Sequence, residues 1–353
     1  MPLSTISAAE AISGLRNFSS IIDARSPSEF ALDHLPGAVN WPSLDDAERA
    51  LVGTEYKQVA PFAARKHGAA LVARNIAMHI ERHVLELPRD WSPLVYCWRG
   101  GQRSSSLAAV LGQIGFRVHL LEGGYRQYRR AIVADLERLP ALLQWRVVCG
   151  PTGSGKSRLL QALRDQGAQV LDLEGLANHR GSVLGLVPGT AQPTQKAFDS
   201  ALWNALRQFD PARPVFVESE SRKVGDLRVA EPLVAQMRSA PCVWLELALD
   251  ARVALLLADY AFFVSDTPAF TARLDALRVL LGNELVDAWQ GQAQAGNSAQ
   301  VVRDLLLRHY DPVYQRSLLR NYADIASSAL RIAWDGSDRS LDAAAHQAIE
   351  RCP

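Results

Sequence analysis

The cysteine at position 97 begins a short run of glycine, arginine and polar residues that is typical of an anion-binding loop. The run is Cys97-Trp98-Arg99-Gly100-Gly101-Gln102-Arg103. Its glycines let several backbone N–H groups point at one spot, and its arginines add positive potential there. Such surroundings favour the thiolate, which is the nucleophilic form of cysteine. A cysteine that only fills space in a core is the alternative, but packing alone does not call for two glycines and two arginines around a sulfur atom.

A second anion-binding loop follows later in the chain. It is Gly150-Pro151-Thr152-Gly153-Ser154-Gly155-Lys156-Ser157, the Gly-x4-Gly-Lys-Ser pattern of a P-loop. The backbone N–H groups of such a loop cradle phosphates at a helix N-terminus, and Lys156 neutralises the terminal phosphate. Ser157 would bind Mg²⁺ through its hydroxyl if a metal is present. The pattern does not fix the ligand, so any pyrophosphate fits and a requirement for ATP is left open.

Several polar residues follow apolar runs that we expect to be strands. The runs 170–174 and 214–220 end in carboxylates: Asp172, Glu174, Glu218 and Glu220. Either Glu218 or Glu220 falls where a second metal-binding or water-orienting carboxylate commonly lies. A carboxylate that is only solvated at the rim of the sheet is an alternative of equal weight. His179 and Arg180, beside a glycine, either hold a substrate or cap the local structure.

The segments around the two loops predict the elements that position them. Residues 94–96 read as a buried strand before the cysteine, and residues 104–114 as an amphipathic helix after it. Residues 144–149 and 156–165 predict a strand and a helix on either side of the P-loop. Buried apolar runs that alternate with helices indicate a parallel sheet. From 250 to 328 the pattern is mostly helical.

Composition sets the class of protein. The 353 residues are 48% hydrophobic with a formal net charge of +1, which indicates a globular chain of two or three domains. No run approaches the length of a membrane span, and we expect neither a signal peptide nor a membrane partner. The four cysteines show neither metal nor disulfide spacing, which favours the cytoplasm. Arginine outnumbers lysine, and arginine–aromatic groups near 125–130 and 308–320 are either solvated helix faces or RNA contacts.

The N-terminal third resembles the rhodanese domain. Three landmarks carry the resemblance: Ser20 to Phe30, His34 to Asn40, and Val118 to Leu121 with the following Glu-Gly-Gly-Tyr. The resemblance implies a small α/β domain whose cysteine carries a sulfur-group element. The Cys-x5-Arg spacing is one residue longer than is usual in sulfurtransferase rhodaneses and matches the related cysteine phosphatases, whose loop accommodates a tetrahedral oxyanion. We expect Asp23, Arg25 and His34 to brace this fold.

The pairing of the two loops resembles the tRNA 2-selenouridine synthase family. Besides residues 97–104, the string Asp172 to Ser182 carries this resemblance, which runs over nearly the whole chain. It implies an α/β protein with a rhodanese-like domain at 1–130, a linker helix at 131–143 and a P-loop kinase-like domain at 144–353 with a helical C-terminal part. The family exchanges the sulfur of wobble 2-thiouridine in tRNA for selenium from selenophosphate, and transfers a geranyl group from geranyl diphosphate to that sulfur.

This resemblance suggests a ligand for each loop. We expect the P-loop to bind geranyl diphosphate and the Cys97 loop to bind selenophosphate, with Cys97 taking selenium as a perselenide or directing its delivery. The expected partners are tRNA carrying 2-thiouridine and the selenophosphate-producing enzyme. Three alternatives are a small-molecule or nucleoside kinase with a regulatory rhodanese-like domain, an anion-sensing module without chemistry, and a cysteine phosphatase.

Overall fold

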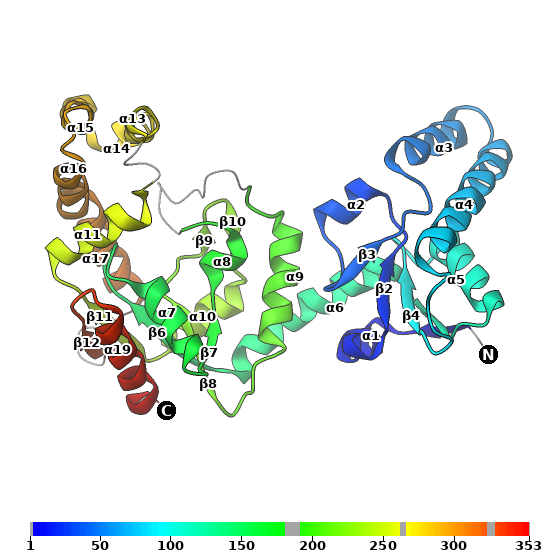
Figure 1. Ribbon diagram of the computed structural model, residues 1–353, viewed down its shortest axis with the longest axis horizontal. Coiled ribbons are helices and arrows are strands. Elements are labelled where there is room, and N and C mark those ends of the chain that lie inside the picture. The colour runs from blue at the N-terminus through cyan, green and yellow to red at the C-terminus, as the bar shows by residue number, and fades with distance from the viewer. Residues whose placement is uncertain (1–2, 181–190, 262–265, 323–328, 353) are drawn as a thin grey trace. The chain divides into compact units, whose positions relative to one another are not determined.

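The structure, a computed structural model, describes residues 3–180, 191–261, 266–322 and 329–352. The chain forms two compact units (Figure 1). The first contains Met1–Glu137 and Pro193–Asn204, and the second contains Arg138–Gln192 and Ala205–Pro353. Both units are built on five-stranded parallel sheets, so the α/β fold class expected from the sequence is confirmed.

The sheet of the first unit has the strand order β1-β5-β4-β2-β3. Its strands are β1 (Leu3–Ile6), β2 (Ser20–Asp23), β3 (Ala38–Asn40), β4 (Pro93–Tyr96) and β5 (Val118–Leu121). All four residues of the central strand β4 are buried, as expected of a parallel strand covered by helices on both faces. The carboxyl end of this strand delivers Cys97, at the edge of a parallel sheet where sites commonly form.

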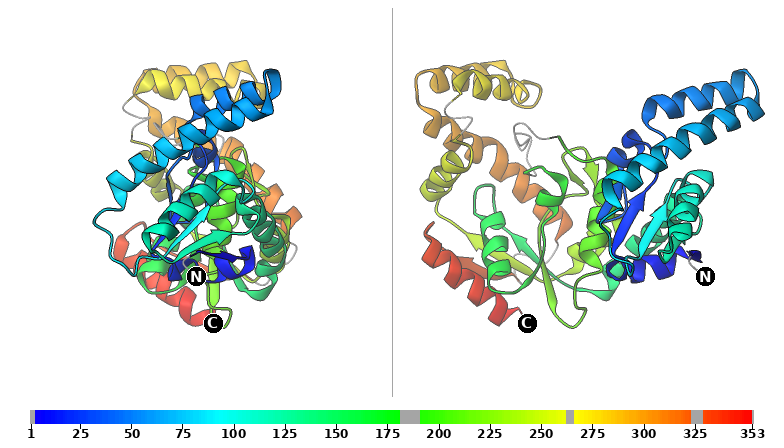
Figure 2. Two further views of the ribbon diagram at one scale, coloured as in Figure 1. Left: turned by 90° about the vertical axis from the view of Figure 1, so that its right-hand side faces the viewer. Right: turned by 45° about the vertical axis from the view of Figure 1, so that its right-hand side comes forward.

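Helices surround this sheet. They are α1 (Ala8–Ser13), α2 (Pro27–Leu32), α3 (Asp46–Gln58), α4 (Pro61–His83), α5 (Gln102–Ile114), α6 (Gly124–Arg138) and α9 (Gln195–Leu206). Capping boxes at Ser7, Ser26 and Asp45 satisfy the first amides of three of them. Helices α3 and α4 form a long antiparallel pair that projects from the sheet (Figure 2).

The second unit holds the P-loop in a sheet of order β12-β11-β6-β8-β7. Its strands are β6 (Gln144–Cys149), β7 (Gln169–Leu171), β8 (Pro214–Glu218), β11 (Cys242–Glu246) and β12 (Leu330–Ala333), and β9 (Lys223–Val224) pairs separately with β10 (Leu227–Arg228). The strand and helix that flank the P-loop have the bounds that the sequence predicts. The expected strand 170–174 is shorter, because Asp172 instead caps a helix: its side chain accepts a hydrogen bond from the Gly175 amide.

The helices of the second unit include the predicted helical C-terminal part. They are α7 (Lys156–Asp165), α8 (Leu173–Ala177), α10 (Glu231–Ser239), α11 (Leu249–Asp259), α13 (Thr267–Asp275), α14 (Arg278–Leu281), α15 (Asn283–Gln294), α16 (Ser298–Leu305), α17 (Asp311–Asn321) and α19 (Asp338–Arg351). A π-helical turn, Leu306–Tyr310, joins α16 to α17. The chain then returns to the sheet as β12 and packs α19 against α7.

The division of the chain differs in detail from the expected domain boundaries. Residues 131–138 continue α6, and the expected linker ends as a 3₁₀ turn, Leu139–Leu142. Most of helix α9, up to Asn204, belongs to the first unit although it lies within the expected P-loop domain in sequence. There the Trp203 indole donates to Asp135 at 2.9 Å, and its ring meets Tyr128 edge-on. Short sequence patterns do not reveal such a return of the chain.

Candidate functional sites

The Cys97 loop wraps a buried sulfur atom. Cys97 is 3% exposed, and the fully buried Ser104 donates its hydroxyl to the sulfur at 3.0 Å. The thiol itself lies 3.7 Å from the Gly101 carbonyl oxygen. Helix α5 begins within the loop at Gln102, so its N-terminal amides and positive dipole end lie next to the cysteine. A hydroxyl donor and a helix N-terminus both stabilise negative charge on sulfur.

Glycines fix the shape of this loop. Gly100 has φ +68, and Gly124 at the start of α6 has φ +58. A Cβ atom on Gly124 would lie 2.2 Å from the Cys97 carbonyl oxygen, so only glycine fits there. The same carbonyl accepts a hydrogen bond from the Tyr125 amide at 2.8 Å, and the Trp98 carbonyl accepts one from Arg126 at 3.1 Å. The rhodanese-like segment Glu-Gly-Gly-Tyr therefore packs against the cysteine loop and stabilises it through these hydrogen bonds.

The two arginines of the loop have different surroundings. Arg103 is ion-paired with Glu29 at 2.8 Å, and Glu29 also contacts Arg49 at 3.3 Å. These arginines lower the pKa of Glu29 against the opposing effect of its burial. Arg99 is exposed. The charge of Arg103 is thus shared with a carboxylate, whereas no ion pair of Arg99 is found among the described residues.

A buried ion pair supports the sheet edge beside this loop. Arg25 is 1% exposed and binds the Asp23 carboxylate at 2.6 Å, and its guanidinium lies 3.9 Å from the centre of the Tyr125 ring. The Tyr125 hydroxyl in turn donates to Asp33 at 2.7 Å. Burial raises the pKa of Asp33, and hydrogen bonds and Arg129 oppose this rise. The ring of His34 stacks on that of Phe30. The described contacts of Asp23, Arg25 and His34 are thus with other residues of the domain rather than with the Cys97 sulfur.

The P-loop of the second unit has the expected strand–loop–helix setting. Gly150, Gly153 and Gly155 all have positive φ angles, which lets the loop curl around a space that amides can face. The Lys156 ammonium donates to the Gly150 carbonyl at 2.8 Å and lies 5.4 Å from the centre of the Tyr314 ring. Burial lowers the pKa of Lys156, and nearby carboxylates act in the opposite direction.

Neighbouring elements hold the P-loop closely. A Cβ on Gly155 would lie 2.4 Å from the Trp334 ring, and the Trp334 indole donates to the Ser154 carbonyl at 2.8 Å. The Ser154 hydroxyl is buried, and a Cβ on Gly150 would lie 2.5 Å from it. Because the ring of Trp334 fills the space beside Gly155, the loop tolerates no side chain there.

The expected carboxylates occupy two distinct environments. The Ser157 hydroxyl donates to Glu174 at 3.1 Å, whereas Glu218 is 2% exposed and accepts the Glu174 amide at 2.8 Å. Burial raises the pKa of Glu218 well above its usual range. Burial, together with Glu174, raises the pKa of Glu220 to about 7. Glu218 is therefore a buried support of α8, while Glu174 and Glu220 are the carboxylates that face the P-loop.

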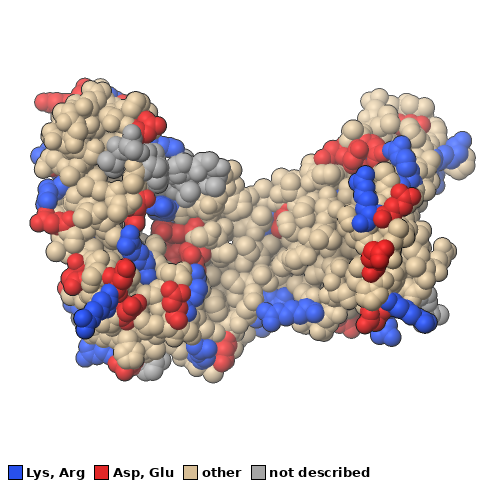
Figure 3. All heavy atoms as spheres, in the orientation of Figure 1, with Lys and Arg blue, Asp and Glu red and all other residues tan. Residues whose placement is uncertain are grey.

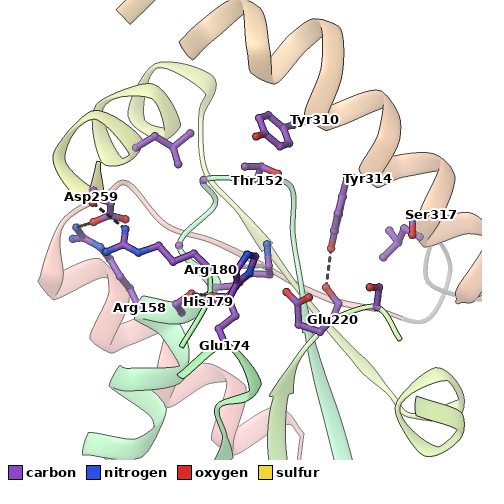
Figure 4. A pocket seen from close by; sticks show the side chains of 18 of the residues that line it. Thr152, Arg158, Glu174, His179, Arg180, Glu220, Asp259, Tyr310, Tyr314 and Ser317 are labelled. Atoms are coloured by element: carbon purple, nitrogen blue, oxygen red, sulfur yellow. Dashed lines mark hydrogen bonds and ion pairs between the residues drawn. The ribbon is translucent and has the colours of Figure 1, made fainter. Parts of the chain in front are cut away.

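A cavity of about 700 Å³ gathers most of these groups. The predicted residues that line it are Gly153, Gly155, Lys156, Ser157, Asp172, Glu174, His179, Arg180 and Glu220. Figure 4 shows Arg158 and Arg180 together beside Asp259, with Tyr314 reaching down from α17 on the other side. His179 is 7% exposed, and burial lowers its pKa. Gly181 and Ser182, the end of the predicted string, lie outside the described residues.

Sequence reasoning missed several residues of this site. Arg252 is buried and donates twice to the Thr152 carbonyl of the P-loop, at 2.9 and 2.7 Å, while it binds Asp311 at 2.6 Å. The Tyr314 hydroxyl accepts the Gly150 amide at 2.8 Å. Tyr314 and Tyr310 belong to the arginine–aromatic group 308–320, and its aromatic members line the cavity whereas its arginines are exposed.

The lining of the cavity includes several apolar side chains. Leu255 and Leu256 come from α11, and Val313 and Leu318 come from α17. Together with Tyr310 they face the same space as the P-loop. The cavity lining therefore combines phosphate-binding amides with hydrocarbon contacts, a combination that suits an amphiphilic anion.

Neither charge predominates on the face of the molecule drawn in Figure 3. On the face drawn in Figure 3, basic and acidic side chains of the described residues are interspersed. Within the described part of the chain, no group of three or more His, Cys, Asp or Glu side chains forms a metal site. No helix in the described ranges is long and apolar enough to span a membrane.

Comparison with known proteins identifies the family. Residues 143–277 match the family described as tRNA 2-selenouridine synthase AAA domain, and residues 7–131 match the rhodanese-like domain. The tRNA 2-selenouridine synthase of Alcanivorax borkumensis is 33% identical over 88% of this chain and 92% of its own. The proteins of that name from Cupriavidus necator and Nitrosomonas europaea are 35% and 37% identical, over 83% and 68% of this chain and 87% and 63% of theirs. This chain belongs to the tRNA 2-selenouridine synthase family.

Proposed function

We propose that this protein converts 2-thiouridine at the wobble position of tRNA to 2-selenouridine, with S-geranyl-2-thiouridine as the intermediate. The observation that carries the proposal is the cavity of the second unit, where the P-loop and several apolar side chains line one space. A diphosphate that carries a hydrocarbon chain matches both kinds of lining residue. The names and near full-length similarity of the curated relatives support the overall reaction.

In the first half-reaction, the P-loop holds the diphosphate of geranyl diphosphate. The geranyl chain contacts the apolar side chains that line the cavity, among them Leu255, Leu256 and Val313. The sulfur of 2-thiouridine attacks the first carbon of the chain, the carbon–oxygen bond breaks, and its electron pair leaves with pyrophosphate. Lys156 stabilises the charge that develops on the leaving group. The proton on N3 of the base is lost, because the alkylated base is neutral without it.

The side-chain oxygens of Ser157 and Glu174 are suitable ligands for the Mg²⁺ ion that the P-loop sequence suggests. The Ser157 hydroxyl and the Glu174 carboxylate lie within hydrogen-bond distance of each other, and both are hard oxygen donors. These two residues would hold the ion, whose positive charge offsets that of the diphosphate. Because Mg²⁺ usually keeps several waters and substrate phosphates as ligands, two protein oxygens suffice.

In the second half-reaction, the Cys97 loop binds the phosphoryl group of selenophosphate and directs delivery of its selenium. The selenium–phosphorus bond is hydrolysed to give inorganic phosphate and selenide. Selenide adds to C2 of the alkylated base, the carbon–sulfur bond breaks, and geranylthiol leaves after taking a proton. Alkylation explains why this exchange works, since a neutral thiol is a far better leaving group than the sulfur of a thiocarbonyl. The amides at the start of α5 supply the anion contacts.

Separate half-reactions test the assignment of each ligand to its loop. With geranyl diphosphate and no selenophosphate, we expect Cys97→Ser to form S-geranyl-2-thiouridine and Lys156→Ala to form almost none. Lys196→Ala, which removes an exposed lysine of the first unit, should behave like the wild type. Mass spectrometry of the digested nucleosides gives the readout. Lys156→Ala that kept geranylation but lost selenation would show that the ligands are assigned wrongly.

A further inference from the structure

The pair of helices α3 and α4 ends in an exposed apolar tip. No residue of α3 is buried. At the turn between the helices, Tyr56 is 54% exposed, Val59 is 74% exposed and Phe62 is 66% exposed. Two aromatic rings and a valine are thus mostly exposed around one projecting turn, which Figure 2 shows at the far end of the helix pair.

The same tip carries cations that have no acidic partner. Lys57, Arg65 and Lys66 are exposed and make no ion pair within the described chain. The Lys66 ammonium lies 5.1 Å from the centre of the Phe62 ring. The nearest acid in sequence, Glu55, is hydrogen-bonded to His67 at 3.1 Å. Exposed aromatic rings interleaved with unpaired cations are the combination that binds single-stranded nucleic acid, through base stacking and phosphate contacts.

The base of this helix pair is attached directly to the Cys97 loop. The Ser43 hydroxyl, just before α3, donates to the Arg103 carbonyl at 2.9 Å, and Asn75 of α4 donates to the Ser43 carbonyl at 3.1 Å. Ile76 lies in the same buried cluster as Cys97. At 1.5 Å per helical residue, the distance from Ile76 to Phe62 along α4 is about 20 Å. A nucleic acid that binds at the tip therefore needs to extend over only about 20 Å to come near the cysteine.

Another exposed apolar turn in the protein has the opposite electrostatic character. Val279 and Leu280 of α14 are 95% and 62% exposed, but the adjacent Arg278 is paired with Asp275 at 2.8 Å and Asp287 at 2.7 Å. The charge of Arg278 beside that turn is thus already neutralised by two carboxylates. Charge complementarity thus separates the α3–α4 tip from the α14 turn and favours a polyanion as its occupant.

We propose that the α3–α4 tip binds the anticodon arm of the tRNA substrate, an inference that rests on the proposed function. Unpaired bases stack on Tyr56 and Phe62, and backbone phosphates contact Lys57, Arg65 and Lys66. The contact places the wobble nucleotide near the Cys97 loop for the selenium-transfer step. Base stacking requires unstacked loop nucleotides, so the tip favours an anticodon stem-loop over a continuous duplex.

Binding of a synthetic anticodon stem-loop with 2-thiouridine at the wobble position tests this surface. The full chain is compared with Tyr56→Ala/Phe62→Ala, with Lys57→Gln/Lys66→Gln, and with the control Arg89→Gln/Arg117→Gln. The control removes two exposed cations of the same unit that lie outside the tip. We expect the aromatic pair to weaken binding at least about tenfold. The lysine pair should reduce the slope of log affinity against log salt by about 1.4, and the control should match the wild type.

Different outcomes separate this inference from the proposed function. Unchanged RNA affinity and salt slope in both tip variants would overturn the RNA surface. If those variants then lost selenation only when the selenophosphate-producing enzyme supplied the selenium, the tip would be a protein-docking site instead. Wild-type protein that binds the RNA but forms no 2-selenouridine would contradict the proposed function and leave the RNA surface standing. Circular dichroism and an unchanged thermal unfolding profile verify that each variant is folded.

Discussion

Replacement of Arg252 by methionine should destabilise the second unit and weaken diphosphate binding together. Arg252 is 6% exposed, and its guanidinium joins the Thr152 carbonyl of the P-loop to the Asp311 carboxylate at the start of α17. Methionine keeps most of the apolar volume but removes every one of these hydrogen bonds. The P-loop carbonyl and the Asp311 carboxylate then lose their partner, and the loop is no longer tied to α17.

The size of this effect follows from the burial of the pair. Loss of one partner of a fully buried ion pair costs about 3–5 kcal/mol. Asp311 keeps 29% of its side chain exposed, and water can solvate it in the variant, so we expect a loss of about 2–3 kcal/mol. For a unit of roughly 200 residues, each kcal/mol lowers Tm by about 2–4 °C, which gives a decrease of about 4–12 °C. Diphosphate affinity should fall at least about tenfold, since the loop loses its preorganised shape.

Thermal unfolding and calorimetric titration with geranyl diphosphate measure the two effects on the same protein. The control is Arg331→Met, because the Arg331–Glu246 pair is about half exposed on both sides and should contribute at most about 1 kcal/mol. A double-mutant cycle with Asp311→Asn should give a coupling of about 1–3 kcal/mol. Arg252→Met with unchanged affinity for geranyl diphosphate would refute the view that this arginine preorganises the P-loop.

Three further predictions concern single groups in the two sites. Gly155→Ala should reduce geranyl diphosphate affinity at least about tenfold, because the new Cβ would lie 2.4 Å from Trp334; Gly167→Ala, at a similar positive φ in open space, should not. Ser104→Ala should slow alkylation of Cys97 by iodoacetamide about tenfold, measured by peptide mapping, while Ser105→Ala has little effect, since only Ser104 donates to the sulfur. Affinity for geranyl diphosphate should fall as pH rises through about 7, because Glu220, with its pKa raised to about 7, then gains negative charge beside the diphosphate; Glu220→Gln should remove this part of the pH dependence. A pH profile identical in the wild type and Glu220→Gln, equal affinities for the two glycine variants, or equal alkylation rates for the two serine variants would contradict the respective prediction.

The fold could be predicted from local sequence because both sites follow strong strand–loop–helix patterns. The apolar run of β6, the glycines of the P-loop and the helix α7 have the bounds that the pattern indicates. The strand expected at 170–174 was too long, since a carboxylate directly after an apolar run can cap a helix as easily as it ends a strand. The return of α9 to the first unit depends on contacts such as Trp203 with Asp135, and residues that far apart in sequence leave no local signal.

The two anion-binding loops could be predicted from the sequence, but the full set of side chains that surround the P-loop could not. Lys156, Ser157 and Glu174 lie around one space, as their positions after the carboxyl ends of two strands, β6 and β7, of one parallel sheet suggest. Glu218 and Glu220 are only two residues apart, yet one is buried beneath α8 and the other faces the cavity, and the direction of each side chain decides this difference. Arg252 and Tyr314 reach the P-loop from helices far along the chain, so neither carries a motif that could have revealed it.

Nucleoside mass spectrometry of tRNA incubated with selenophosphate and geranyl diphosphate tests the central claim most directly. The tRNA carries 2-thiouridine, and wild-type protein is compared with Cys97→Ser and Lys156→Ala. The account predicts 2-selenouridine from the wild type, accumulation of S-geranyl-2-thiouridine with Cys97→Ser, and unmodified 2-thiouridine with Lys156→Ala. No modified nucleoside from the wild type, with ATP consumed instead when it is supplied, would contradict the account and favour a kinase.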